Sequence, residues 1–257
     1  MPASLTVDHY LRALATAGGR LVDSAEQAGL DTAVPTCPGW GARALLAHQA
    51  MVHRFAAANV LPGDPDDYPN QTTILAEVAD LPAFYREGHA ALIAALRDAP
   101  VDLEALTFLN DAPPPREFWA RRQAHETTIH MADAVAARVG RLPASETVDV
   151  PSPIAVDGID ELLRGFFTRG RSKLFEGTEY AVLVAPTDSE RRWYVRIAEH
   201  LTVAPGDDDG DGDADATISG TAAALYLGLW NRGDEIEVEG DPDILSRWRQ
   251  AERIRWG

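Results

Sequence analysis

The stretch RRQAHETTIHMADA, residues 121–134, continues a helical pattern and places a carboxylate and an imidazole four residues apart, at Glu126 and His130. Side chains at this spacing are separated by about 40° around an α-helix, so both can reach one point. If they face the core of the protein, they need a partner, because burying such groups without one is costly. The fold of the first half must therefore be known before the role of Glu126 and His130 can be inferred.

Long helical patterns fill the first half of the 257-residue chain, with no strand pattern between them. We expect helices from about Leu5 to Gly29, from Arg43 to Asn59, from Thr73 to Arg97, and from the proline run at 113–115 to Arg138. Four long helices in succession are typical of a helical bundle. The sequence therefore predicts that residues 121–134 belong to the last helix of a four-helix bundle.

The second half has a different pattern, in which short β-rich runs alternate with helices. After a proline-bearing linker we expect a helix from Asp160 to Lys173, β-rich runs at 180–187, 191–203 and 216–220, a helix at 221–232, a strand at 236–240 and a terminal helix at 241–256. This order is an α+β pattern. The predicted fold is thus a two-domain α+β protein, with a helical bundle at 1–145 and a smaller α+β domain at 155–257.

Composition limits the possible partners and surroundings. The formal net charge of −17 makes nucleic acid and anionic lipid unfavourable partners. The sequence lacks both an apolar run of about 18 residues and a secretory signal, so we expect no membrane span. Cys37 is the single cysteine, which excludes an intramolecular disulfide and favours a cytoplasmic location. The sequence leaves a monomer or a homodimer open.

The second helix offers a third candidate ligand, His48, which lies within an apolar face of that helix, whereas His53 is displaced from it. Two bundle helices could bring His48, Glu126 and His130 to one cation. Three protein ligands with an open fourth position are the arrangement of catalytic zinc sites. Asp133, three residues after His130, could orient that imidazole. The alternative is a solvated pair or a plain Glu–His hydrogen bond without a metal.

The spacing excludes one familiar zinc site. His125 lies five residues before His130, about 140° away around the helix, so the two imidazoles cannot share a ligand position. The segment reads HExxxH, whereas zinc proteases carry HExxH. Glu126 and His130 remain candidate metal ligands, and the spacing excludes a zinc protease.

The segments VPTCPGWGARALLAH (34–48) and RRQAHETTIHMADA (121–134) resemble the mycothiol-dependent maleylpyruvate isomerase family, as do ATISGTAAALYLGLWNR (216–232) and IEVEGDPDILSRWR (236–249). The family is actinobacterial, and its members have a DinB-like four-helix bundle followed by a C-terminal domain. In the family a zinc ion is held by a histidine after the PGW motif and by the glutamate and histidine of ExxxH. The resemblance assigns these roles to His48, Glu126 and His130.

The resemblance also implies mycothiol as the thiol cofactor and a small electrophilic, carboxylate-bearing substrate. A zinc-bound thiol is deprotonated near neutral pH. The thiolate adds to the cis double bond of maleylpyruvate, rotation follows, and elimination yields fumarylpyruvate. Arg232 is the candidate catalytic residue for a substrate carboxylate, and its alternative role is a favourable charge at a helix C-terminus. The competing functions are a mycothiol S-transferase, which would keep the adduct, and a non-catalytic metal-binding or ligand-binding protein.

The sequence departs from the family pattern at two places. Gly41 and Ala44 replace a frequent capping box, so we expect a weaker helix start there. Met131 replaces an arginine that often follows the histidine of ExxxH.

Other features are interpreted as structural. We expect Cys37 to pack near the start of the second helix rather than act as a nucleophile, and Arg122 to form a surface or inter-helix ion pair. The Asp-rich segment beginning at Asp207 matches the opening of a calcium loop but has Ile218 where that loop needs a glutamate, so a solvated hairpin is favoured. Trp193, Trp230 and Trp248 are expected to anchor the core or an interface.

Overall fold

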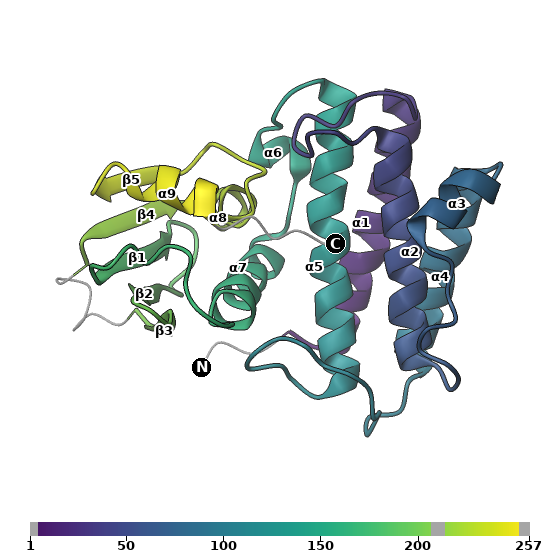
Figure 1. The fold of residues 1–257 in the computed structure, drawn as a ribbon, viewed down its shortest axis with the longest axis horizontal. Helices are drawn as coiled ribbons and strands as arrows, with labels where there is room; N and C mark the ends of the chain where they lie inside the picture. The colour runs from purple at the N-terminus through teal and green to yellow at the C-terminus, as the bar shows by residue number, and fades with distance from the viewer. Residues whose placement is uncertain (1–4, 207–213, 252–257) are drawn as a thin grey trace. The chain divides into compact units, whose positions relative to one another are not determined.

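A computed structural model describes residues 5–206 and 214–251, which form two compact units. Residues 5–108 and 112–143 make up the first unit, and the described residues of 109–111 and 144–251 make up the second. The first unit is helical and the second contains a five-stranded sheet (Figure 1). The predicted two-domain α+β fold is confirmed.

Four long helices, α1 (Val7–Ala28), α2 (Ala42–Val60), α4 (Leu81–Asp98) and α5 (Pro115–Val139), lie side by side in the first unit (Figure 1). Helix α1 packs against α4 and α5, and α2 packs against the same two helices, so the four close into a bundle. All four contribute fully buried side chains to its core: Leu14, Leu21, Leu45, Leu46, Tyr85, Leu92, Leu96, Trp119 and Val135. This packing holds α2 and α5 next to each other.

The single helix predicted from Thr73 to Arg97 is wrong, because the chain forms two helices there, α3 (Gln71–Glu77) and α4. The Asp80 carboxylate accepts a hydrogen bond of 3.0 Å from the backbone N–H of Ala83 and so starts a new helix. Pro82 occupies the first turn of α4, where its missing N–H is not needed. These local signals interrupt an apolar periodicity that continues across the break.

The sheet of the second unit has the strand order β3-β2-β1-β4-β5. Its strands are β1 (Tyr180–Pro186), β2 (Trp193–Ile197), β3 (Thr202–Pro205), β4 (Ala216–Gly220) and β5 (Glu237–Gly240). Strands β1 and β4 pair in parallel, and the other three pairs are antiparallel. The helices of this unit are α6 (Ser145–Val148), α7 (Ser152–Asp160), a π-helix η1 (Glu161–Phe166), α8 (Ala222–Leu229) and α9 (Ile244–Ala251).

The helix predicted from Asp160 to Lys173 is also wrong in its bounds. Helical structure begins at Ser152, inside the segment expected to be a linker, and ends with η1 at Phe166. Pro151 is the N-cap residue of α7 and Pro153 lies in its first turn. Proline is tolerated at such positions, because the first N–H groups of a helix have no partner within it.

Tryptophans anchor the second unit, as expected. Trp193, Trp230 and Trp248 are 1%, 7% and 0% exposed. The indole N–H of Trp193 donates to Asp160 at 3.0 Å, and that of Trp248 donates to the carbonyl of Leu229 at 3.1 Å. These two bonds satisfy the polar atoms that the rings of Trp193 and Trp248 bury. The calcium-loop residues Asp207, Asp209, Asp211 and Gly212 lie outside the described residues.

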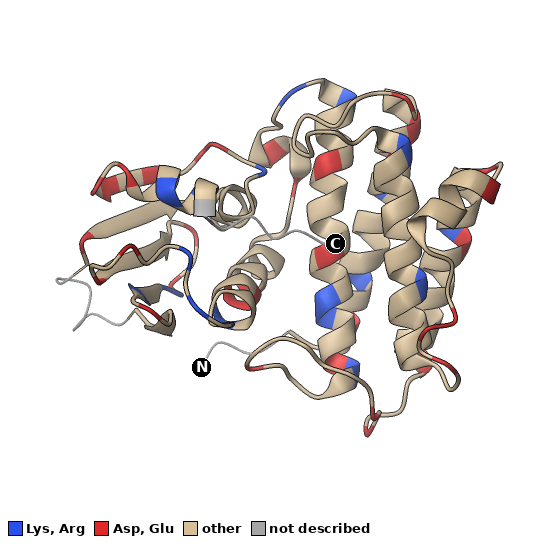
Figure 2. Ribbon diagram, viewed as in Figure 1, with Lys and Arg blue, Asp and Glu red and all other residues tan. Residues whose placement is uncertain are grey.

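Charged residues of both signs are spread over both units (Figure 2). Strand β5, at one edge of the sheet, carries Glu237 and Glu239, and charge on an edge strand discourages pairing with another chain. Among the described residues, no helix is long and apolar enough to cross a membrane.

Two neighbouring glycines of α1 give a test of the bundle packing. An added Cβ at Gly18 would lie 2.2 Å from His89 Nε2, whereas one at Gly19 would meet nothing within 4 Å. His89 Nε2 is hydrogen-bonded to the carbonyl of Leu14 at 3.0 Å, so its displacement would break that bond. We expect Gly18→Ala to lower the free energy of unfolding by about 1–3 kcal/mol.

Gly19→Ala is the matched control and should raise the free energy of unfolding by up to about 1 kcal/mol, through helix propensity alone. Urea unfolding followed by circular dichroism measures both changes. Equal stabilisation by the two substitutions would contradict the close packing of α1 against α4.

Candidate metal centre

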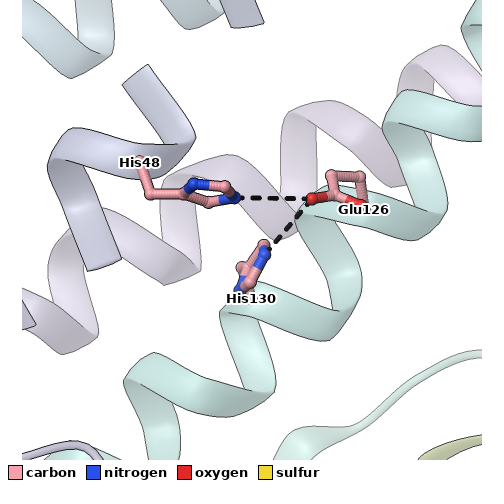
Figure 3. A group of neighbouring side chains, drawn as sticks. All are labelled: His48, Glu126 and His130. Atoms are coloured by element: carbon pink, nitrogen blue, oxygen red, sulfur yellow. Dashed lines mark ion pairs between the residues drawn. The ribbon is translucent and has the colours of Figure 1, made fainter. Parts of the chain in front are cut away.

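Three buried side chains converge between α2 and α5: His48 from α2, and Glu126 and His130 from successive turns of α5 (Figure 3). Glu126 Oε1 lies 3.2 Å from His130 Nε2 and 3.8 Å from His48 Nε2. One ligand atom from each residue lies within 4.8 Å of the other two. Tetrahedral ligands of zinc are roughly 3.4 Å apart at the usual bond lengths. The structure thus brings together the three residues that the sequence selected.

Two polar atoms at this point lack a hydrogen-bond partner among the described residues. His48 Nε2 and Glu126 Oε1 are buried without a hydrogen-bond partner in the described part of the chain. Leaving such atoms unsatisfied costs about 1–3 kcal/mol each. Imidazole nitrogen and carboxylate oxygen are ligands that zinc and similar first-row metals accept. The donor set therefore fits a divalent cation.

Asp133 orients one of the imidazoles. His130 Nδ1 donates to Asp133 Oδ2 at 2.9 Å, and Thr36 Oγ1 donates to Asp133 Oδ1 at 2.6 Å. Because Nδ1 donates to Asp133, Nε2 is the nitrogen that faces Glu126 and that would bind a metal in place of its proton. The position of Asp133 was predicted from its spacing. Thr36 was missed, because 97 residues separate it from its partner.

A folded loop before α2 covers the two imidazoles. Ala33 and Gly41 form an isolated β-bridge, and the Val34 N–H donates to the Trp40 carbonyl at 2.9 Å. The centre of the Trp40 ring lies 5.0 Å from the centre of the His48 ring and 6.4 Å from that of the His130 ring. The planes of the Trp40 and His130 rings are nearly parallel, with an angle of 12° between them. The sequence showed the PGW motif but not that its tryptophan packs on both candidate ligands. Gly41 is the N-cap residue of α2 and has no side chain to cap it, in keeping with the missing capping box.

Arg122 neutralises the second oxygen of the glutamate. Its Nη2 donates to Glu126 Oε2 at 2.8 Å, and the side chain is 1% exposed. The expectation of a surface ion pair is therefore wrong, since the side chain is buried, and this pair lies within α5. Its i, i+4 spacing was visible in the sequence. The two oxygens of Glu126 consequently face different partners, with Arg122 on one side and the imidazoles on the other.

Electrostatic effects in this cluster follow from burial and close opposite charges. Burial alone would raise the pKa of Glu126, but His130, His48 and Arg122 lower it well below its ordinary value. Burial alone would lower the pKa of His130, but Asp133 and Glu126 raise it to about 9. Glu126 is therefore an anion throughout the physiological pH range, which suits a metal ligand.

The other histidines near the cluster face elsewhere. The His125 ring contacts Tyr10 of α1 edge-on, with 6.3 Å between the ring centres. His53 Nε2 is hydrogen-bonded to Thr127 Oγ1 at 2.9 Å. Both observations agree with the helical spacing, which excluded these residues as ligands. Cys37 is partly buried in the loop before α2, and its packing role stays a prediction.

Arg232 lies in the second unit, just beyond α8. Its Nη1 donates to the carbonyl of Trp230, the C-cap residue of α8, at 2.8 Å. This is the favourable helix-end interaction considered as the alternative for this residue. A contact between Arg232 and a substrate carboxylate stays a prediction.

Comparisons with known proteins agree with this architecture. Residues 11–135 match the family described as the mycothiol maleylpyruvate isomerase N-terminal domain, and residues 153–247 match the C-terminal domain of that family. No curated protein sequence matches the chain.

Solved structures give the same result for the fold. A crystal structure of the mycothiol-dependent maleylpyruvate isomerase is 18% identical, with a TM-score of 0.63 over 91% of this chain and 93% of that chain. A variant of that enzyme with one histidine replaced by alanine is 16% identical, with a TM-score of 0.61 over the same shares of both chains. With both domains matched in order, the chain belongs to the mycothiol maleylpyruvate isomerase family.

Proposed function

We propose that the protein is a metal-dependent, mycothiol-using enzyme that catalyses the cis–trans isomerisation of a maleylpyruvate-like substrate. The observation that carries the proposal is the convergence of His48, Glu126 and His130, with ligand atoms within 4.8 Å of one another, in a chain of this family. Zinc is the proposed ion, because two imidazoles and one carboxylate leave a fourth position for sulfur. When bound, such an ion lowers the pKa of a thiol so that the thiolate exists near neutral pH.

The proposed reaction neither gains nor loses atoms overall. The thiolate adds to one carbon of the cis double bond, which becomes a single bond and rotates. Expulsion of the thiolate then restores the double bond in the trans form. The chain's own residues hold the candidate ligands in place. Asp133 bonds to the His130 imidazole, Trp40 packs on the His48 imidazole, and Arg122 bonds to the Glu126 carboxylate.

A mycothiol S-transferase would use the same site and the same first step. The two functions differ in whether the carbon–sulfur bond breaks again, and hence in the substrate rather than in the metal ligands. A non-catalytic protein on this fold would bind the metal or another ligand without catalysing a reaction.

Metal content is the first prediction. The purified protein should hold about one zinc ion per chain, and His48→Ala and Glu126→Ala should each lose it, because either change removes one of three ligands. Elemental analysis of the purified variants measures this, with circular dichroism to establish that they fold. His125→Gln is the matched control and should keep the metal, since its ring faces Tyr10. Equal metal content in all four proteins would contradict the site.

Thiol dependence is the second prediction. Conversion of maleylpyruvate to fumarylpyruvate, followed by absorbance, should require mycothiol and fall to background in His48→Ala. A stable mycothiol adduct with other electrophiles, and no isomerisation, would assign the S-transferase function instead. The enzyme hypothesis is lost if every electrophile tried reacts equally fast with and without mycothiol.

The third prediction concerns Arg232, which we propose binds a substrate carboxylate. Arg232→Gln keeps a neutral donor for the Trp230 carbonyl but removes the charge. KM for a dicarboxylate should then rise roughly tenfold or more, since hydrogen bonds to charged groups are strong. KM for an uncharged electrophile should not change. A fall in melting temperature with both KM values unchanged would leave Arg232 only its role at the end of α8.

A further inference from the structure

Gln123 lies on the same side of α5 as the candidate ligands but belongs to none of the interactions described above. It stands three residues before Glu126 and seven before His130. At about 1.5 Å per residue, these separations correspond to roughly 4.5 Å and 10.5 Å along the helix axis. Residues at such spacings share one helix face. The amide of Gln123 is therefore the next polar group along α5 from the metal ligands.

The oxygen of this amide is buried and has no hydrogen-bond partner in the described part of the chain. Gln123 is 2% exposed, and its Oε1 has no hydrogen-bond partner among residues 5–206 and 214–251. Neighbouring hydroxyl groups of α5 do have partners, since Thr127 bonds to His53 and Thr128 bonds to the carbonyl of Ala124. Buried polar groups without partners are rare, because losing hydration without a new bond costs free energy. An unpaired oxygen on the same helix face as the unpaired Glu126 Oε1 points to a bound molecule as the partner.

Helix α2 passes this position without providing a partner. It contacts α5 on either side of Gln123: His48 lies 3.8 Å from Glu126, and the Phe55 ring lies 5.5 Å from the Trp119 ring. Between these contacts α2 carries the polar residues Gln49, His53 and Arg54. Gln49 and His53 hydrogen-bond to Thr127, and Arg54 donates to the carbonyls of Ala50 and Phe84. Between the two contacts, Gln123 Oε1 is thus an acceptor to which no residue of α2 donates.

We propose that Gln123 Oε1 accepts a hydrogen bond from an amide N–H or hydroxyl group of the thiol that binds at the metal centre. The proposal rests on the proposed function and names the part of the site that recognises the thiol beyond its sulfur. An amide oxygen only accepts, so the ligand must donate. A thiol that carries such a donor a few bonds from sulfur gains this bond, and a simple alkanethiol does not. Gln123 is therefore a specificity-determining residue for mycothiol over small thiols.

The test compares two thiols on the zinc-loaded full-length protein. Isothermal titration calorimetry gives Kd for mycothiol and for ethanethiol, which has no donor besides its S–H group. Gln123→Met keeps the length of the side chain and removes its amide. We expect Kd for mycothiol to rise about 3–10-fold, as for one lost hydrogen bond, and Kd for ethanethiol to stay unchanged. The zinc content should be that of the wild type, and the melting temperature equal or higher.

Gln49→Met is the matched control, because it removes a buried amide whose nitrogen already bonds to His53 and Thr127 within the bundle, while its Oε1, like that of Gln123, has no partner in the described part of the chain. It should lower the melting temperature by roughly 2–8 °C and leave Kd for mycothiol unchanged. The proposal is overturned if Gln123→Met behaves in the same way, since Gln123 would then be structural. Wild-type protein that holds zinc but binds no mycothiol would refute the proposed function, and this inference with it. Mycothiol binding that is equal in wild type and Gln123→Met refutes the inference alone.

Discussion

The buried carboxylate of Glu126 is the constraint on which the rest of the first unit depends. A charge that is 3% exposed must be paired on both of its oxygens, or the bundle loses several kcal/mol by burying it. Arg122 meets one oxygen from the preceding turn of α5. The other oxygen faces His130 and His48, so its environment is complete only when α2 lies against α5. The geometry of the site therefore depends on the packing of α2 against α5.

Helix α5 meets this requirement because its sides have different surroundings. One side packs on α1, and alanines such as Ala124 and Ala132 are fully buried along the helix. The side toward α2 carries the candidate ligands, of which Glu126 is held by Arg122 and His130 by Asp133. The loop before α2 adds two further contacts, through Thr36 on Asp133 and through Trp40 on the imidazoles. A loose loop would leave His130 free to rotate, so the fold of residues 32–42 belongs to the site as much as the helices do.

Much of the fold could be predicted from the sequence. The bounds of α1, α2 and α5 lie within a few residues of those expected, because each helix has a long apolar periodicity between clear breaks. The errors arose where start signals lay inside another pattern. Asp80 and Pro82 begin a new helix within a continuing periodicity, and Pro151 begins α7 in a segment interpreted as a linker. In both places proline marked the start of a helix rather than its absence.

The sequence by itself determined the identity of the cluster, because the four-residue spacing of Glu126 and His130 and the apolar surroundings of His48 are local properties of two helices. Only the tertiary structure decided how the cluster is held. The contact of Thr36 with Asp133 and the packing of Trp40 on both imidazoles join segments far apart in the chain. The unpaired oxygen of Gln123 likewise depends on what α2 fails to offer. No helical period encodes such relations, because they arise only when the helices pack against each other.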